Sequence, residues 1–208
     1  MTAAAIEALR QGAGESVTVV LSGGEEIPCT ADIVADMRLY RGRELDGAEY
    51  SKLRAASALA QTKRRAIDLL SRRSYSSKDL YDRLVQKGEE PQRTAACIRW
   101  LQDNRLLDDE SYAAAVVRHY SAKGYGPARI RQELSRRGIE KELRDEALSG
   151  RPDNTEKINA FIAARLRDPG DRDQVRKLTA ALFRRGYGWE DIRAALARFR
   201  AEAEYEDE

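Results

Sequence analysis

The sequence predicts a mainly α-helical protein of three tandem three-helix repeats, helix-turn-helix-like and arranged in a curved array. A small N-terminal extension containing a β-hairpin precedes them. The main observation is a short motif of basic residue, small residue, tyrosine and small residue, which occurs around Tyr75, Tyr125 and Tyr187. A helical apolar period follows each tyrosine and fills most of the chain after residue 46. Strand character is confined to the first sixty residues.

The N-terminal extension begins with the β-branched, apolar run at residues 17–21. Residues 22–24 are a turn signal, and residues 26–29 form a second strand that Pro28 restricts to a sheet edge. An isolated hairpin is marginal in water, so we expect a following helix or another strand to pack on it. Residues 30–37 predict a short helix.

The first long helical segment starts at Asp46, which forms a capping box with Glu49 three residues later. Residues 48–87 contain no glycine or proline. Two alternatives remain open for this segment, namely one long helix or two helices that meet near Thr62.

The residues that follow each tyrosine predict a capped second helix with one buried stripe. The positions five and nine residues after the tyrosines are apolar, namely Leu80 and Leu84, Ile130 and Leu134, and Ile192 and Leu196. They lie one helical turn apart and therefore share a face. The small residue after each tyrosine occupies the N-cap position, and Gly88 and Gly138 end the first two of these helices. We expect the tyrosines themselves to be core wedges at helix corners.

A third helix completes each repeat. Residues 92–104 and 139–148 supply it in the first two repeats, whereas in the third repeat a helix over 156–167 precedes the helix pair. The predicted division of the chain is an extension at 1–60, repeats at 61–106, 107–150 and 151–200, and an acidic tail at 201–208.

Charge is distributed unevenly along the chain, although the net charge is only +2. Residues 1–60 hold 6 basic and 9 acidic residues, and residues 61–200 hold 31 basic and 21 acidic residues. The tail holds five acidic residues and no basic one. A basic middle between acidic ends indicates an acidic partner such as nucleic acid or an acidic protein surface. Composition alone supports equally well a set of arginine-rich helices that are simply well solvated.

Enzymatic chemistry is not expected, so we assign no catalytic residue, metal or cofactor. The single histidine, His119, lies in a predicted helix at 109–122, and phosphate-loop, dinucleotide, zinc-protease and serine-hydrolase motifs are absent from the sequence. The acidic run at 108–110 reads as a helix start. Cys29 and Cys97 stand far apart and are expected to be inert thiols. The sequence contains no apolar run of membrane-spanning length and no signal peptide, which predicts a cytoplasmic protein.

The candidate binding residues are arginines and lysines at predicted helix ends. Three arginine pairs fall in predicted last turns, where cations also complement the helix dipole. We favour binding, since one cation would suffice for the dipole and these sites carry two next to a turn that presents an aromatic residue. The predicted binding residues are Arg72, Arg73, Lys78, Lys123, Arg129, Arg131, Arg136, Arg137, Arg184 and Arg185.

Residues 64–148 resemble the RecX family, which regulates the RecA recombinase. The resemblance lies in the Tyr75 and Tyr125 motifs with their apolar stripes, in Leu107 to Ala113, and in Arg137-Gly138-Ile139. The Arg184 to Tyr187 segment resembles the third repeat of the family, and residues 42–46 resemble the strand-bearing extension of some members. The resemblance implies a monomeric cytoplasmic protein that binds RecA, chiefly its filament on single-stranded DNA, and contacts single- or double-stranded DNA. It implies inhibition of strand exchange, ATP hydrolysis and coprotease activity in recombination, DNA repair and the SOS response.

Two rival functions remain. A direct nucleic-acid-binding regulator needs one helix rich in base-reading side chains, whereas residues 79–87 and 191–198 carry mixed charge. A non-catalytic protein scaffold would use its charges only for solubility.

Overall fold

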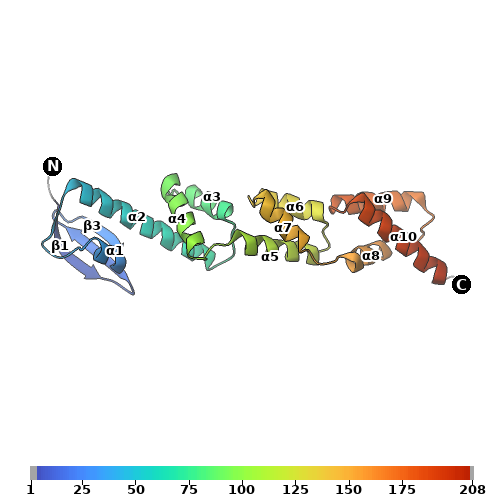
Figure 1. Ribbon diagram of the computed structural model, residues 1–208, viewed down its shortest axis with the longest axis horizontal. Helices are drawn as coiled ribbons and strands as arrows, with labels where there is room; N and C mark the ends of the chain where they lie inside the picture. Colours follow the sequence, from blue (N-terminus) through green and yellow to red (C-terminus); the bar gives the residue numbers. More distant parts are fainter. Residues whose placement is uncertain (1–3, 207–208) are drawn as a thin grey trace. The chain divides into compact units, whose positions relative to one another are not determined.

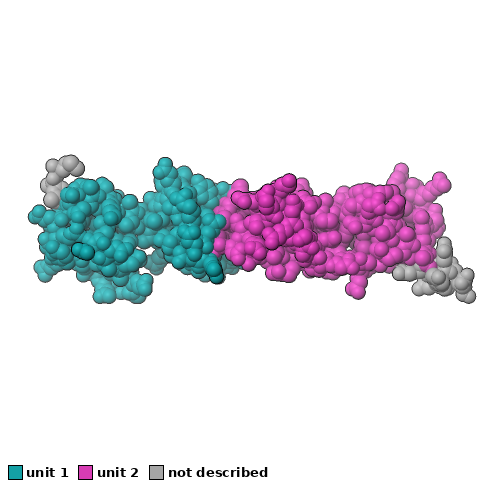
Figure 2. Space-filling view, viewed as in Figure 1, with its two compact units in different colours: residues 1–74, 80–106 teal, residues 75–79, 107–208 magenta. Residues whose placement is uncertain are grey.

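The computed structural model describes residues 4–206 (Figure 1). It is mainly helical, with a small N-terminal antiparallel sheet, as the sequence predicts. The chain divides into two compact units, residues 1–74 with 80–106 and residues 75–79 with 107–208, called unit 1 and unit 2 here (Figure 2). Within the described part of the chain, none of the helices has both the length and the apolar character needed to cross a membrane.

The sheet of unit 1 has the strand order β3-β2-β1-β4, with all neighbours antiparallel. Its strands are β1 (Ala4–Gln11), β2 (Ser16–Leu21), β3 (Glu26–Thr30) and β4 (Glu44–Leu45). The β2–β3 hairpin is confirmed, and Pro28 lies on the edge strand β3 as expected. The sequence analysis missed β1, whose alanine-rich sequence lacks strand character. Pairing with β2 makes it a strand and buries Ile6 to 1% exposure.

Both kinds of partner that the hairpin was expected to need are present. β1 is the further strand, and the helices α1 (Ala31–Asp36) and α2 (Gly47–Leu70) pack on the strands. α2 is one continuous helix, which decides between the two open alternatives. The capping box is confirmed, since the backbone amide of Glu49 donates to Asp46 Oδ1 at 2.8 Å and the Asp46 amide donates to Glu49 Oε2 at 3.2 Å.

α2 serves the sheet and the first repeat together. Leu53 is fully buried in the sheet core, and the Ser57 hydroxyl donates to the carbonyl of Pro28 at 2.5 Å. Further along the helix, the Thr62 hydroxyl donates to the buried carboxylate of Glu89, which follows α3. The helix therefore runs through residue 60 without a break, and the predicted division of the chain stays a prediction.

The helices form three successive three-helix modules. The first helices are α2, α5 (Asp109–Ala122) and α8 (Thr155–Ala163). The second helices are α3 (Ser77–Gln86), α6 (Pro127–Arg136) and α9 (Arg172–Arg184). The third helices are α4 (Pro91–Asp103), α7 (Lys141–Ser149) and α10 (Trp189–Glu206). In every module the first helix packs against the third. α5 has the predicted bounds, whereas α8 ends four residues before the predicted residue 167.

The third repeat has the predicted helix order, with α8 before the pair α9 and α10, but its tyrosine turn is not equivalent to the other two. The turn before Tyr75 and Tyr125 joins a first helix to a second helix, but the turn before Tyr187 joins the second helix α9 to the third helix α10. The turn that matches it contains Gly88 in the first module and Gly138 in the second. Gly138 follows Gly88 by 50 residues, and Gly186 follows Gly138 by 48.

The packing of α8 against α10 sets the register of the third repeat. Backbone geometry does not distinguish the two kinds of turn, because Gly124 before Tyr125 also has a positive φ of 73°, and the Tyr125 amide also donates to the carbonyl five residues earlier, that of Tyr120, at 3.1 Å. Gly88, Gly138 and Gly186 have φ of 90°, 72° and 89°, which a side chain would strain. The residue after each glycine is buried and donates to the carbonyl five residues earlier, in the bonds Glu89 to Leu84, Ile139 to Leu134 and Tyr187 to Leu182 (3.1, 3.1 and 3.2 Å). The prediction failed because both turns of a module combine a small residue with a helix that has the same apolar stripe.

Each module of unit 2 has its own core. The second module buries Tyr112, Ala113, Val116, Val117, Ile130, Leu134, Ile139 and Leu148. The third buries Ile158, Ile162, Leu166, Leu178, Leu182, Tyr187, Ile192, Ala195 and Leu196. Tyr75 and Tyr187 are buried and Tyr125 is half-buried. The tyrosines therefore lie where core wedges would.

Candidate functional site: the arginine groove of the second module

Three of the predicted binding residues meet on the outer face of α6. Arg129, Arg131 and Arg136 line an open groove of about 650 Å³ together with Arg144 of α7. The local sequence explains this placement, because Ile130 and Leu134 turn one face of α6 into the core and leave the arginines outside that face. We call these four arginines and the space between them the arginine groove.

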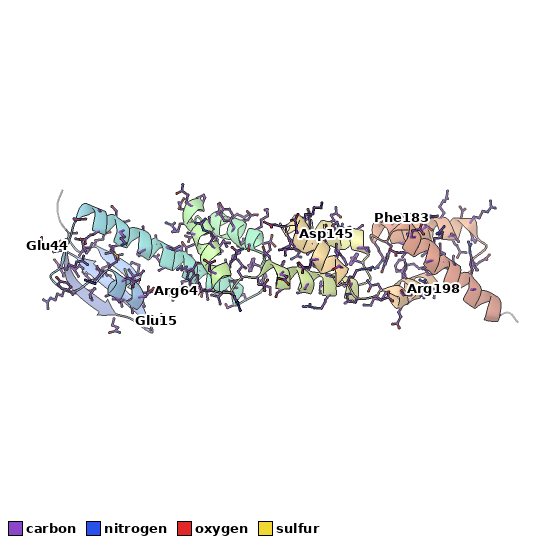
Figure 3. All side chains as sticks on the ribbon, in the orientation of Figure 1. Glu15, Glu44, Arg64, Asp145, Phe183 and Arg198 are labelled. Carbon is purple, nitrogen blue, oxygen red and sulfur yellow. The ribbon has the colours of Figure 1, made fainter. Side chains whose placement is uncertain are left out.

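The outer cations of the groove have weak, exposed partners. Arg129 donates to the side chain of Gln132 at 2.9 Å. Arg131 lies 3.4 Å from Asp145 of α7 (labelled in Figure 3), and both side chains are about half exposed. Exposed pairs of this kind contribute little to stability, so a partner can replace them at small cost.

Arg144 was missed by the sequence analysis. Its Nε is buried and has no hydrogen-bond partner among the described residues, which is unusual for a guanidinium. A lone arginine in an amphipathic helix gives no signal of this kind in the sequence. The structure shows it only because α7 packs beside α6 and brings Arg144 to the groove.

The floor of the groove contains a buried carboxylate, Glu133, whose side chain is only 7% exposed. Arg136 donates to both of its oxygens at 2.7 and 3.1 Å, and Arg137 donates to Oε1 at 2.8 Å. Hydrogen bonds from Arg136 and then Arg137 lower the pKa of Glu133 to about 2, although burial raises it. The carboxylate is therefore ionised at neutral pH and fixes both arginines.

Arg137 and Arg185 occupy equivalent positions and are tied into the fold. Arg137 donates to the hydroxyl of Tyr112 on the first helix of its module and lies over that ring. Arg185 lies 4.5 Å from the ring centroid of Phe161, again on the first helix. It also donates to the carbonyl of Gly124 at 3.2 Å. In both predicted pairs the second arginine is thus largely committed to internal contacts.

The remaining predicted residues do not join the groove lining. Arg72 and Arg73 lie beyond the end of α2 at Leu70 and not in its last turn, which corrects that prediction. Arg72 instead lines a separate pocket of about 400 Å³ in unit 1, with Arg65 and Lys87 among its neighbours.

In unit 2, three further predicted cations lie at helix ends. The side chain of Lys78 lies over Gly138, and the carbonyl of Lys123 accepts a hydrogen bond from Arg185 at 3.2 Å. Arg184 is exposed at the end of α9. None of these three cations lines the arginine groove, which takes its four arginines from α6 and α7.

The acidic run at 108–110 is a helix start, as predicted. Asp108 Oδ1 accepts the backbone amide of Ser111 at 3.0 Å, and Asp109 Oδ1 accepts that of Ser77 at 2.8 Å. Both oxygens therefore accept hydrogen bonds from backbone amides at helix starts, and this capping role accounts for the positions of the two aspartates.

Comparison with known proteins identifies the second module directly. Residues 108–148 match the family described as RecX, second three-helix domain. This range covers α5, α6 and all of α7 except its last residue, and it includes the arginine groove.

Relatives match over a longer stretch. The chain is 40% identical over 134 residues to a regulatory protein RecX of Xanthomonas axonopodis pv. citri, covering 63% of this chain and 83% of the relative. It is 35% identical over 152 residues to a regulatory protein RecX of Vibrio campbellii, covering 71% of this chain and 96% of the relative. Both names describe a regulator, in agreement with the prediction that the chain is not an enzyme.

Two crystal structures share the fold. A regulatory protein RecX aligns with a TM-score of 0.77 at 24% identity, covering 90% of this chain and 96% of that chain. RecX from Lactobacillus salivarius aligns with a TM-score of 0.64 at 22% identity, covering 70% and 99%. The chain has three helical modules and a matched second module, and it covers 83% and 96% of relatives that are 40% and 35% identical to it; it therefore belongs to the RecX family of regulatory proteins.

Proposed function

We propose that the chain binds RecA and its filament on single-stranded DNA in the cytoplasm, and that it inhibits recombinase, ATPase and coprotease activity. The observation that carries the proposal is the arginine groove on the module that matches the family. It combines at least two weakly paired cations, Arg129 and Arg131, with a rigid floor at Glu133. Family resemblance supplies RecA as the partner.

The groove fits a carboxylate- or phosphate-bearing partner for a physical reason. Guanidinium groups bind such oxygens through two parallel hydrogen bonds, and their geometry is fixed when the supporting residues are buried. Glu133 and Tyr112 hold Arg136 and Arg137 in this way. Modules with the same helix contacts would present similar basic ends to a periodic partner such as a filament.

The test measures ATP hydrolysis by RecA with single-stranded DNA in excess over both proteins, so that DNA sequestration cannot imitate inhibition. The double variant Arg129→Ala/Arg131→Ala should need roughly fivefold to thirtyfold more protein for half-inhibition, because exposed interface cations contribute about 0.5–1 kcal/mol each. A matched control, Arg118→Ala/Arg172→Ala, removes two exposed unit 2 arginines that do not line the groove.

Equal inhibition by wild type, groove variant and control would remove the groove from the proposal. Absence of any effect of the wild-type chain on RecA would refute the proposal itself and favour the scaffold alternative, provided that DNA alone is not bound either.

A further inference from the structure

Two glycine turns of unit 2 are each covered by the start of another helix. The turn after α6 contains Gly138, and residues 75–79 at the start of α3, which belong to unit 2, lie on it. The Ser76 hydroxyl donates to the carbonyl of Arg137 at 2.6 Å, and the side chain of Lys78 lies over the glycine. The start of one helix is therefore held on the turn that ends another.

The start of α6 covers the turn after α9 in the same way. The Gly126 amide donates to the Arg185 carbonyl at 2.8 Å, and Arg129 lies over Gly186. The Ala128 amide donates to the Gly186 carbonyl at 3.1 Å. Free amides at a helix start thus meet free carbonyls at a helix end, which suits both helix dipoles. The incoming residue must be small, since a Cβ on Gly126 would overlap the carbonyl of Gly186.

The equivalent turn of unit 1 has no such cover. Gly88 follows α3 with a φ of 90°, and a basic residue, Lys87, again precedes the glycine. Nothing lies within 4 Å of the position that a Cβ on Gly88 would take, and no donor among residues 4–206 bonds to the two carbonyls. Lys87 also lines the pocket of about 400 Å³, together with Arg65, Arg72 and the half-buried Leu69. We call the Gly88 turn and this pocket the α3 socket.

The start of α10 is an uncovered helix start of the kind that the two turns accept. The residue before it is Gly188, whereas the described helices other than α3 and α6 follow a threonine, asparagine, aspartate or glutamate. A Cβ on Gly188 would meet only the Asp191 carboxylate within 4 Å, and the Glu190 amide has no acceptor among the described residues. Trp189 is 55% exposed and leaves ring surface in water.

The α3 socket and the start of α10 complement each other. The pocket of the socket has three cations and one acidic residue, and the first turn of α10 carries Glu190 and Asp191. Glu190 pairs with Arg193 at 2.8 Å, but both side chains are well exposed, so another cation can replace this partner at small cost. A pocket of this size accepts ring-bearing groups, and an indole gains cation–π attraction from guanidinium groups.

From this equivalence we propose that the start of α10 of one copy docks into the α3 socket of a second copy of this chain. The amides of Gly188 and Glu190 donate to the carbonyls of Lys87 and Gly88, as in the two covered turns, and Trp189 enters the pocket. The interface joins two different surfaces, so the copies associate head to tail. The inference is independent of the proposed function, which rests on the arginine groove.

Sedimentation equilibrium of the full chain tests the association from about 10 µM to about 1 mM, the range in which a small interface dissociates. The weight-average mass should rise above that of the single chain as the concentration increases. Lys87→Glu should weaken association by roughly tenfold or more, because it sets like charge against Glu190 and Asp191. Trp189→Ala should weaken it to a similar extent, because it removes the aromatic anchor.

Two matched controls change comparable side chains outside both surfaces. Lys52→Glu reverses an exposed lysine of α2, and Tyr40→Ala removes an aromatic side chain that is 62% exposed. Both controls should associate as the wild type does. Circular dichroism checks that every variant keeps the wild-type helix content.

A mixture of the two disabled variants tests that the surfaces are different. Lys87→Glu keeps an intact start of α10, and Trp189→Ala keeps an intact α3 socket. The mixture, with one variant fluorescently labelled, should therefore form heterodimers with about the wild-type dissociation constant, although each variant alone associates weakly. A single patch that contacts its own copy cannot be rescued in this way.

Three results would overturn the inference. The first is the mass of the single chain at every concentration up to about 1 mM. The second is association of unchanged strength in both Lys87→Glu and Trp189→Ala. The third is a mixture of these two variants that associates no better than either variant alone.

Discussion

Replacing Glu133 by glutamine should destabilise unit 2 and make its stability less dependent on acid. The carboxylate is buried at 7% exposure and accepts three hydrogen bonds from Arg136 and Arg137. Its pKa falls from 4.5 to about 2 on folding, a change whose full value is about 3 kcal/mol. Because the Arg136 side chain is 70% exposed, solvent screens part of this, and we expect a loss of about 1–2 kcal/mol at pH 7.

The pH dependence follows from the direction of the shift. A pKa that is lower in the folded than in the unfolded state stabilises the protein fully above pH 4.5, and the contribution disappears as the pH falls through about 2. The difference in unfolding free energy between wild type and Glu133→Gln should therefore shrink to less than half of its neutral value by about pH 3.

Urea unfolding at several pH values measures this difference. A Trp100→Phe background leaves Trp189 as the reporter in unit 2, and Glu146→Gln on the exposed face of α7 is the matched control, expected within about 0.5 kcal/mol of wild type. A difference of constant size from pH 7 to pH 3 would contradict the reasoning, since it would show that the charge of Glu133 does not contribute to stability.

Two further predictions concern packing. Gly126→Ala should lower the free energy of unfolding of unit 2 by roughly 2–4 kcal/mol, because its Cβ would overlap the carbonyl of Gly186 and disturb the bond from the Gly126 amide to Arg185 (2.8 Å). Thermal unfolding measures this loss. The control is Gly150→Ala, whose added Cβ would lie 3.9 Å from the nearest atom and which should be near neutral; equal losses in the two variants would rule out the Gly126 contact as the cause. Burial raises the pKa of Cys97, like that of Cys29, to about 11, so neither thiol should react with a disulfide reagent at pH 7 before unfolding; rapid native labelling would contradict this.

The commitment of Arg137 and Arg185 to internal contacts changes how a mutational test should be designed. A substitution of the Arg136–Arg137 pair would remove the Glu133 and Tyr112 contacts along with any binding contact. Loss of inhibition in such a variant would then report on folding as well as on binding. Arg129 and Arg131 avoid the problem, because their partners within the protein are exposed and weak.

Local sequence signals determined most of the helical elements. The capping box at Asp46, the proline at the first turn of α6 and the glycines that end α3 and α6 all lie where their intrinsic backbone preferences place them. Helical periodicity determined which faces are buried, since an apolar stripe must leave water wherever the helix packs. These features depend on residues within a few positions of one another, and the sequence displays such relationships directly.

Only the tertiary structure decided the features that depend on distant partners. β1 is a strand because β2 provides its hydrogen bonds, although its own residues favour no strand. The register of the third repeat depends on which helices pack together, because both turns of a module share one local pattern. Likewise, Arg129, Arg131, Arg136 and Arg144 have similar sequence surroundings to other exposed arginines, and it is the packing of α7 beside α6 that gathers them into one groove.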